Sequence, residues 1–545
     1  MAISTVPLTS AAAQVAPIAA PAQSADQLAQ QGLAAHHAGD LALAQTRYRE
    51  CLALNPAHAD AMLMLGVLRI AALDFVEAEQ LIETAGKLTH WRNPAYRQNY
   101  GLVLSAIIPH HDPVSGVASR VPLRQLTEHI AARENQPLST LKTALRNGAG
   151  AALDGAQLTR IATRIRTSPR RTSSASLLND GFDLIGYAHS ESGLAENMRA
   201  LARSCVASDI PHTLIDIELD GDGEANNPTL TPPNALEPAF KRQIICVNPD
   251  AMAVVAHHEG TGAFTSAYKI GYWFWELEKL PATWMHMAGS MQELWAGSDF
   301  VRKALASAVS IPVYKVPPSI LPPQPSRPYA RSEFGVADDD FVFLFSFSYW
   351  SFIARKNPWA VINAFRQALP PSITRAKLII KTIHSEKFAQ QSAALHALAA
   401  GDPRIVFIDH SLSRDQVMGL QHACDCYVSL HRSEGFGLGM AECMALGKPV
   451  IATAYSANLD YMNEANSLLV DYSLIAVKAD EYPDAQQQVW ADANVESAAR
   501  NMRALFDDQA LRARLGSAAK DFMQTHFSPA AVGAQLQAHL QRLNR

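Results

Sequence analysis

The chain has 545 residues, and at about 150 residues per domain this length predicts three or four domains rather than one small binding module. It carries 46 Lys and Arg residues against 51 Asp and Glu residues, a net charge of −5, which is not the basic footprint of a nucleic-acid-binding protein. Hydrophobic residues make up 48% of the chain and charged residues 18%, which is too apolar for a chain disordered throughout. We expect a multidomain globular protein with no nucleic-acid partner.

Residues 1–24 are rich in Ala, Pro and Ser and predict a disordered tail, since they lack the basic start and continuous apolar stretch of a signal peptide. No run of the sequence reaches the roughly 20 apolar residues of a membrane span. Six cysteines are scattered along the chain, and Cys424 and Cys426 form a C-x-C whose spacing suits neither zinc nor a redox turn. We expect reduced core thiols and a cytoplasmic protein.

Residues 25–106 contain an internal repeat with a period of 34 residues, in which Gly32, Asp40 and Ala44 recur as Gly66, Asp74 and Ala78. This pattern resembles the tetratricopeptide repeat, a helix-turn-helix unit that stabilises its neighbours by stacking. A partial third unit follows around Tyr100 and Gly101. Because about three units are normally needed for stability, we expect the array to lean on the next domain. Its role is open between a concave surface for a protein partner and a spacer or oligomerisation unit.

Residues 107–180 predict a helical connector, with helices around 121–134 and 155–166. Its basic patch contains Arg160, Arg164, Arg166, Arg170 and Arg171. The patch is open to two interpretations, contact with an anionic membrane surface or a solvated linker. The first would place the protein peripherally at the inner face of the membrane.

Two blocks, 181–325 and 326–505, alternate short apolar runs with helical stretches. The runs are FDLIGYA, HTLIDIE, RQIICVN, YKIGYWF and ELWAGS in the first block, and FVFLFSFS, AKLIIK, RIVFID, DCYVSL and PVIATA in the second. Continuous apolar strands between helices predict parallel sheets covered on both faces. We therefore expect an α/β fold with two doubly wound domains facing a cleft, joined by the proline-rich segment 317–328. Helices are expected at 506–545, one of them capped by Ser528-Pro529.

A glycine-containing loop follows the strand DCYVSL. It runs HRSEGFGLGMAE over 431–442, so that Glu434 and Glu442 flank three glycines. Ligands of such sheets bind beyond the carboxyl ends of the strands. Glycines let the backbone approach a ligand, and the N–H groups of a helix starting near 436–438 suit a diphosphate. The two carboxylates can accept hydroxyl hydrogen bonds, one from a sugar and one from a ribose.

The segment SEGFGLGMAECMALGKPVIAT is similar to the E-x7-E signature of family-4 glycosyltransferases, retaining enzymes of the GT-B fold. The likeness extends over most of 182–500, through GYAHSESGLAENMRALAR, GYWFWELEKLP, ELWAGSDFV, ARKNPWAVINAF and ATAYSANLDYMN. The resemblance implies a retaining hexosyltransferase with a UDP- or GDP-linked sugar donor, no metal and no other cofactor.

The resemblance also implies roles for single residues. Glu434 should meet hydroxyls of the donor sugar, Glu442 the ribose, and Lys356 in RKNP the diphosphate. The N–H groups that should meet the sugar and phosphates are those of Gly435, Phe436, Gly437 and Leu438. Relatives usually carry a second basic residue about six positions before the lysine, where Trp350 and Ser351 stand here. The candidates for that role are Arg355 and Lys381, and for Lys381 a surface position is equally open.

The first block should hold the acceptor and the facing wall of the cleft. Gly193 begins a helix after the first strand, as glycines near the donor phosphates do in this fold. Glu276 follows the strand at which many relatives place a histidine near the reacting sugar, and it either orients a sugar or holds a neighbouring loop. Trp273 and Trp275 are open between sugar stacking and core packing. Asn458 and Asp460 are expected to line the cleft floor or to shape the turn SANLD.

Two clusters resemble metal sites by composition. Asp220-Gly221-Asp222 has the form of a metal-binding D-x-D but belongs to a turn-like sequence, so we expect a surface hairpin. His257-His258-Glu259 has adjacent histidines, which point to opposite faces of a strand. We expect no metal at either.

The leading hypothesis is a glycosyltransferase acting on a glycan or lipid-linked acceptor in surface polysaccharide or lipopolysaccharide-type biosynthesis. A second hypothesis keeps the donor site but takes a polypeptide acceptor through the repeats. A third is a repeat-based scaffold with a vestigial transferase domain.

Overall fold

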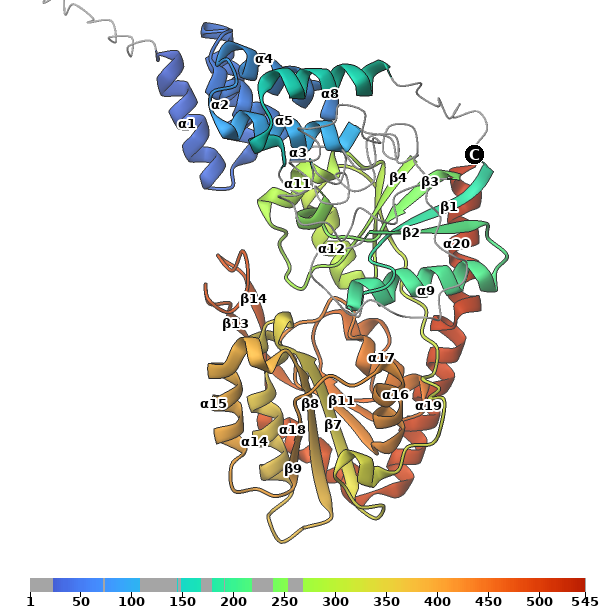
Figure 1. Cartoon of the computed structure of the whole chain (residues 1–545). Helices are drawn as coiled ribbons and strands as arrows, with labels where there is room; N and C mark the ends of the chain where they lie inside the picture. Colours follow the sequence, from blue (N-terminus) through green and yellow to red (C-terminus); the bar gives the residue numbers. More distant parts are fainter. Residues whose placement is uncertain are drawn as a thin grey trace, which may run out of the picture.

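A computed structural model of the chain describes residues 23–71, 74–107, 145, 149–167, 179–190, 192–217, 239–252 and 268–544. Within these residues the chain runs from a helical array through two α/β domains to a helical C-terminal segment (Figure 1). The predicted tail lies almost wholly outside them, as does the helix predicted at 121–134. None of the helices in this described part is both long and apolar enough to cross a membrane.

The helical array contains α1 (Ala25–His37), α2 (Leu41–Leu54), α3 (Ala59–Ala71), α4 (Phe75–Leu88) and α5 (Pro94–Ile107). Its repeated glycines lie where paired helices cross. A Cβ on Gly32 would lie 2.6 Å from the Tyr48 ring, and one on Gly66 would lie 2.5 Å from Ile82. The predicted helix at 155–166 is α8 (Gly155–Thr167), which packs on α5 in a core that contains Tyr100 and Leu158. The repeat prediction is confirmed.

The first α/β domain is built on one sheet of parallel strands. Its strands are β1 (Asn179–Gly186), β2 (His212–Asp216), β3 (Phe240–Ile245), β4 (Tyr268–Trp273), β5 (Glu293–Ala296) and β6 (Val313–Lys315), in the spatial order β2-β1-β3-β4-β5-β6. Its helices include α9 (Gly193–Ala207), α11 (Ala282–Ala288) and α12 (Asp299–Ala308). The strand order steps outward from β1 in both directions, as expected for a doubly wound domain.

The second α/β domain repeats this plan with the order β12-β11-β10-β7-β8-β9, again with every strand pair parallel. The strands are β7 (Phe341–Ser348), β8 (Ala376–Ile383), β9 (Ile405–Ile408), β10 (Cys426–Ser429), β11 (Val450–Thr453) and β12 (Leu468–Val470). The helices include α13 (Ile353–Lys356), α14 (Pro358–Ala368), α15 (Ala389–Ala399), α16 (Arg414–Ala423) and α17 (Leu438–Ala445).

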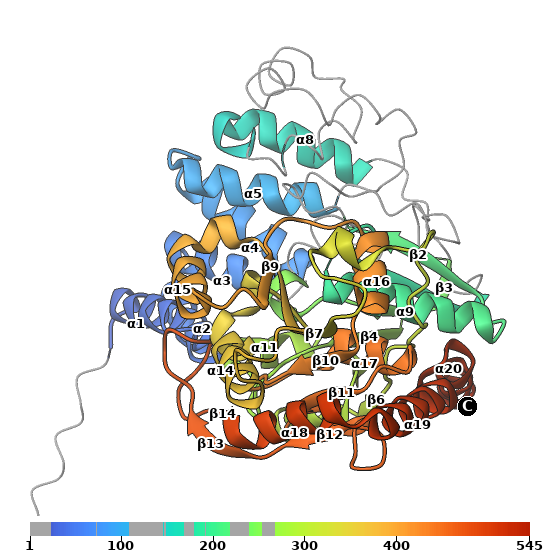
Figure 2. The same ribbon diagram turned by 90° about the horizontal axis from the view of Figure 1, so that it is seen from below.

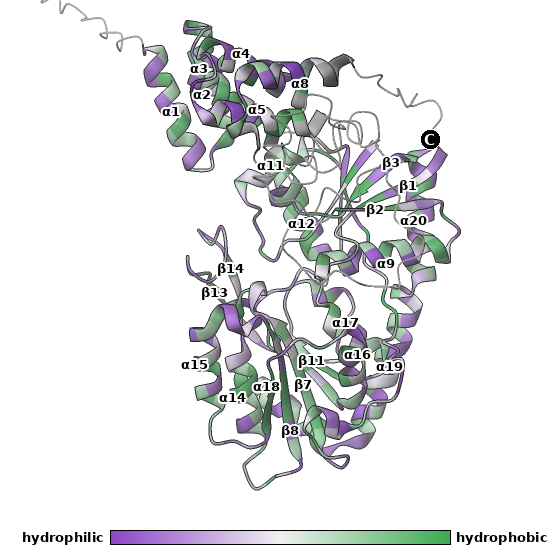
Figure 3. Cartoon of the chain, in the orientation of Figure 1, coloured by the Kyte–Doolittle hydropathy of each residue, from purple (hydrophilic) through white to green (hydrophobic). Residues whose placement is uncertain are grey.

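The strand β7 shows why this sheet is covered on both faces. Val342 and Leu344 pack in one core with α16 and α17, while Phe343, Phe345 and Phe347 pack in another with α14. Burial of such a side chain contributes about 1.5–3 kcal/mol, so neither face can be left to solvent. The strands β7 and β8 are accordingly apolar while the outer helices carry hydrophilic residues (Figure 3). The apolar runs predicted as strands in the second domain are thus confirmed.

A hairpin that the sequence analysis did not predict follows β12. It consists of β13 (Tyr472–Ala476) and β14 (Val489–Ala493), which pair antiparallel and apart from both sheets. Figure 1 shows it projecting from the second domain toward the first.

The helices α18 (Val495–Asp507), α19 (Gln509–Phe527) and α20 (Pro529–Leu543) follow one another along one side of the molecule (Figure 2). The predicted Ser528 cap begins α20, where its side chain accepts from Ala531 N. Gly533 of α20 lies directly against Ser204 and Ser208 at the end of α9, so the chain returns to the first domain. The predicted linker 317–328 crosses beside this return, and Ile320 N donates to Phe527 O at 2.7 Å.

The repeats lean on the first α/β domain, as their small number predicts. A Cβ on Gly39, between α1 and α2, would lie 3.7 Å from Thr283 in α11, and Ile70 of α3 packs against the core that contains Met287. The array therefore packs beside α11. All six cysteines are free and buried, which places them in the cores as the sequence predicts.

Candidate active site

The glycine loop between β10 and α17 has a backbone that only glycine adopts easily. Gly437, the N-cap of α17, has φ of +90°, and a Cβ there would lie 2.3 Å from Met440 Cε and 2.8 Å from the Tyr461 hydroxyl. That hydroxyl donates to Phe436 O at 2.8 Å. Because Gly437 has no side chain to cap α17, the first N–H groups of the helix are left for another acceptor. The helix begins at Leu438, as predicted.

Substituting Gly437 with alanine is expected to destabilise the protein by about 1–3 kcal/mol, because the side chain would both strain the left-handed backbone and overlap Met440. Thermal unfolding measures this, with Gly193→Ala as the matched control. Nothing lies within 4 Å of a Cβ at Gly193, which is the first residue of α9. An equal fall in the unfolding midpoint of both variants would contradict the assignment of strain to Gly437.

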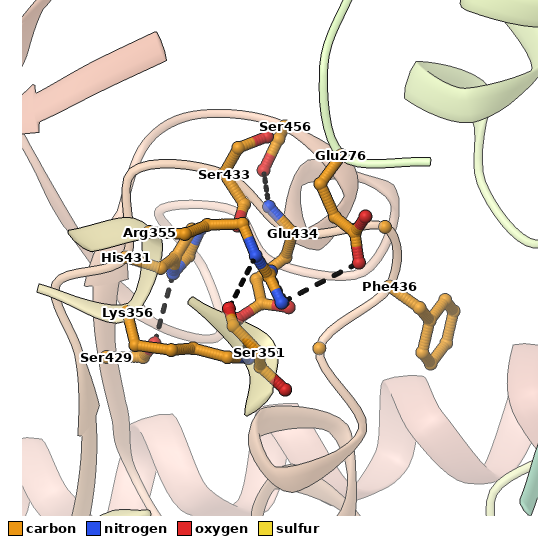
Figure 4. Close-up of polar contacts among 12 residues, drawn as sticks. Glu276, Ser351, Arg355, Lys356, Ser429, His431, Ser433, Glu434, Phe436 and Ser456 are labelled. Carbon is orange, nitrogen blue, oxygen red and sulfur yellow. Dashed lines mark hydrogen bonds and ion pairs between the residues drawn. The ribbon is translucent and has the colours of Figure 1, made fainter. Parts of the chain in front are cut away.

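A buried carboxylate and two cations lie just before this loop (Figure 4). Glu434 is 7% exposed, and its Oε1 accepts from Lys356 Nζ at 2.5 Å while its Oε2 accepts from an Arg355 guanidinium nitrogen at 3.0 Å. Arg355 also donates to Ser433 O at 2.9 Å. Glu434 follows β10, and the two cations follow the neighbouring strand β7, so the carboxyl ends of adjacent strands bring them together.

The charges in this cluster depend on one another. Burial would raise the pKa of Glu434, but Lys356 and Arg355 outweigh it and lower that pKa to about 2. Burial lowers the pKa of Lys356, and the charge of Glu434 offsets only part of that effect. The carboxylate is therefore ionised at neutral pH, and it remains so because both cations accompany it.

The short segment carrying the cations has an unusual backbone. Phe352 and Asn357, which bracket α13, have φ of +61° and +53°, values that side-chain-bearing residues seldom adopt. Asn357 is held there because its Nδ2 donates to Leu430 O at 3.1 Å, at the end of β10. The strained turn therefore directs Arg355 and Lys356 toward the loop that carries Glu434.

Two residues to which the sequence analysis assigned no role help to hold the loop that carries Glu434. Ser456, with φ of +74°, accepts from Glu434 N through its Oγ at 2.9 Å. His431 is fully buried, with Nδ1 3.1 Å from Ser429 Oγ and Nε2 3.2 Å from both Tyr455 O and Asn458 Oδ1. Asn458 itself donates to Thr453 O at 2.9 Å, so it shapes the floor under the loop. The sole local signal for His431 is its position directly after the strand.

The first domain contacts this cluster through Glu276, in the segment after β4. Its Oε1 lies 3.7 Å from a guanidinium nitrogen of Arg355, so Arg355 sits between Glu276 and Glu434 (Figure 4). A Cβ on Gly435 would lie 3.5 Å from Trp275 O, which shows how closely the two domains approach. Ser298, at the start of α12, donates to Gly435 O at 2.9 Å. The glycine loop is therefore bounded by both domains.

Other predicted residues lie around this centre. Asp460 accepts from Asp299 N at 3.0 Å and from Lys315 Nζ at 3.2 Å, so it links the domains. Trp273 and Trp275 are buried in apolar clusters, which favours core packing over sugar stacking. The D-x-D at 220–222 and the cluster at 257–259 lie outside the described residues.

Glu442 is buried in α17 and is held by a second network. It accepts from Gln421 Nε2 at 2.6 Å and forms an ion pair with Arg414, both on α16. Arg414 also interacts electrostatically with Glu196, in the first turn of α9. Glu442 and Glu434 thus face different partners at the two ends of the glycine loop.

Lys381 is buried at the end of β8 rather than on the surface. It is 5% exposed, its Nζ donates to Thr382 O at 2.8 Å, and burial lowers its pKa to about 8 despite the nearby charge of Asp409. The structure does not bring Lys381 into contact with Glu434 or Lys356.

Comparison with protein families gives two matches in this chain. Residues 330–522 match the family of glycosyl transferases group 1, and residues 35–97 match a tetratricopeptide repeat family. The second α/β domain is a group 1 glycosyl transferase domain. Together with the first it forms the GT-B fold, preceded by tetratricopeptide-like repeats.

Solved structures similar to this chain include sucrose-phosphate synthase from Thermosynechococcus elongatus, at 14% identity over 67% of this chain and 99% of that one, with a TM-score of 0.49. A glycosyltransferase from Rickettsia africae gives 14% identity over 68% and 100%, with a TM-score of 0.48. Anabaena HepE in complex with UDP and glucose gives 14% over 67% and 100%, with a TM-score of 0.45. A comparison with curated proteins found no match.

Proposed function

We propose that the protein is a retaining glycosyltransferase that moves a hexose from a nucleoside-diphosphate sugar to an acceptor hydroxyl. The observation that carries the proposal is the buried Glu434 carboxylate, paired with Lys356 and Arg355 immediately before the uncapped N-terminus of α17. A donor with a diphosphate and a hydroxyl-bearing sugar offers one partner for each of these groups.

In this proposal the diphosphate binds at the first N–H groups of α17, near Gly435, Phe436, Gly437 and Leu438. Lys356 turns from Glu434 to the phosphate oxygens, and Glu434 then accepts hydrogen bonds from the hydroxyls of the sugar. Positive charge fixed beside the leaving diphosphate lowers the transition-state energy by about 3–4 kcal/mol for one such donor. Glu442 would release Arg414 or Gln421 and accept a hydrogen bond from the ribose. Lys381 and Asn458 would lie at the periphery of the donor site.

The acceptor hydroxyl would attack from the side of the first domain, where Glu276 faces the cluster. Retention of configuration is supported by the similarity to the E-x7-E signature, and Lys356 with the helix N-terminus supplies the charge that a metal would otherwise provide. We infer a metal-independent enzyme, which activity in the presence of EDTA tests. The anomeric configuration of the product, measured by NMR, tests retention.

The experiment that tests the function starts with thermal shifts against UDP, GDP and their sugars, followed by transfer assays with the donor that binds. Label from that donor is then followed into glycan, lipid and protein fractions. Label in glycan or lipid supports a role in surface polysaccharide or lipopolysaccharide-type synthesis. A protein that binds and transfers none of these donors would favour a scaffold with a vestigial transferase domain.

A polypeptide acceptor is the second candidate, and one observation favours it. The repeats pack on α11 through Gly39 and Thr283, and α11 directly follows the segment that carries Glu276. A polypeptide held by the array would therefore lie beside the acceptor wall. Label found in protein alone would select this candidate.

Gly193→Ala is expected to reduce donor affinity by about tenfold without changing the unfolding midpoint. A Cβ at Gly193 meets open space in the protein, so a loss could come only from a ligand that approaches α9. Isothermal titration with the identified nucleotide measures it. Unchanged affinity would show that the donor does not reach Gly193.

A further inference from the structure

The hairpin β13–β14 is attached by its base to the loop that carries Glu434. Ala491 N donates to Arg432 O at 3.0 Å, two residues before Glu434. The Arg432 guanidinium lies 5.4 Å from the centre of the Trp490 ring and 3.3 Å from an Asp492 oxygen. The hairpin is therefore fixed to the donor side of the site.

The connection between the two hairpin strands, residues 477–488, is attached to the first domain. The Gln488 side chain accepts from Lys279 N at 3.1 Å and donates to Lys279 O at 2.6 Å. Lys279 Nζ in turn donates to Gln487 O at 3.1 Å. Lys279 lies three residues after Glu276, so the hairpin joins the segments that carry Glu276 and Glu434.

Tyr482 projects from this connection into the contact between the domains. It is 6% exposed, and its ring centre lies 4.8 Å from that of Phe352 and 5.4 Å from that of Trp275. Its hydroxyl donates to Glu276 Oε2 at 2.5 Å. Burial, together with the charge of Glu276, raises the pKa of Tyr482, so the phenol stays protonated and acts as the donor.

We propose that Tyr482 is a positioning residue for sugar transfer, which acts by holding the carboxylate of Glu276. The phenol occupies Oε2 and leaves Oε1 directed to the side of Arg355 and Gly435. Without the Tyr482 hydroxyl, Arg355 can pair with both oxygens of Glu276 and turn the carboxylate away from the acceptor. The inference rests on the proposed function, because it gives Glu276 its partner in the same site.

The test compares Tyr482→Phe, Glu276→Ala and the double variant in the full-length protein. Tyr482→Phe keeps the aromatic ring and removes one hydrogen bond to a carboxylate, so kcat should fall about tenfold. The donor KM should change by less than about twofold, because the donor contacts are unaltered. In the Glu276→Ala background, Tyr482→Phe should have no further effect, since the group through which it acts is gone.

Tyr455→Phe is the matched control. The Tyr455 hydroxyl donates to Glu278 at 3.2 Å, another cross-domain bond from a tyrosine to a glutamate of the same segment. The kcat of Tyr455→Phe should stay within about twofold of the wild type.

The proposal is overturned by an unchanged kcat in Tyr482→Phe, or by a higher donor KM in place of a lower kcat. It is also overturned if Tyr482→Phe lowers kcat equally with and without Glu276. A wild type that transfers no sugar overturns the proposed function as well, whereas an active wild type with these outcomes overturns the inference alone.

Discussion

Glu434→Gln is expected to lower sugar transfer at least about a hundredfold, because the amide cannot replace a carboxylate in charge-assisted hydrogen bonds to the donor sugar. It is also expected to destabilise the ligand-free protein by about 3 kcal/mol, since Arg355 and Lys356 would lose the buried carboxylate that they share, and the more distant Glu276, 3.7 Å from Arg355, would be the acid left beside them. A nucleoside diphosphate would supply that charge. It should therefore raise the unfolding midpoint of the variant by more than that of the wild type.

Two assays check this expectation, initial rates of transfer and thermal unfolding with and without the nucleotide. Glu464→Gln is the control, because Glu464 is exposed in the same domain. Full transfer activity in Glu434→Gln would remove the carboxylate from the mechanism. A nucleotide shift smaller than that of the wild type would show that the diphosphate does not meet the two cations.

Lys356→Ala should reduce transfer by about a hundred- to a thousandfold, the cost of removing one preorganised donor from a developing charge. Glu434 keeps Arg355 as a partner, so its carboxylate remains paired and the fold should tolerate the change better than Glu434→Gln. Nucleoside diphosphate affinity should fall along with kcat, while affinity for the nucleoside alone should not change.

Titration calorimetry with the diphosphate and the nucleoside separates those effects. Lys387→Ala, at an exposed lysine of the same domain, is the control. Equal losses of affinity for the nucleoside and the diphosphate would place Lys356 away from the phosphates.

The features that the sequence predicts are those whose signal is local. The apolar runs predicted as strands, the glycine loop and the start of α17 each follow from adjacent residues, whereas the short edge strands β6 and β12 were not predicted. Ser456 could not be found in this way, since it lies 22 residues from Glu434 in the sequence. It also has a positive φ, a backbone conformation that the presence of a serine does not predict. Tyr482 lies 206 residues from Glu276, and only the closure of two domains brings them together.

Glu442 also shows how far local sequence signals predict the site. Its position on α17, beyond the glycines that follow Glu434, follows from the spacing of the motif. Its contacts with Arg414 and Gln421 depend on how α16 packs against α17. A short sequence pattern does not predict that packing. The hairpin also went unpredicted, although SLIA and VWAD are short apolar runs on either side of a segment that contains the turn-forming Pro483 and Asp484.

The hydrogen bond between Ile320 and Phe527 has a mechanical consequence. The chain passes between the α/β domains at the linker and again at the α19–α20 junction, and this bond ties the two crossings into one pivot. Figure 1 places the hairpin on the opposite side of the molecule from α19 and α20. A rotation of the domains about the pivot would therefore move the hairpin side most, and it would first separate Gln488 from Lys279.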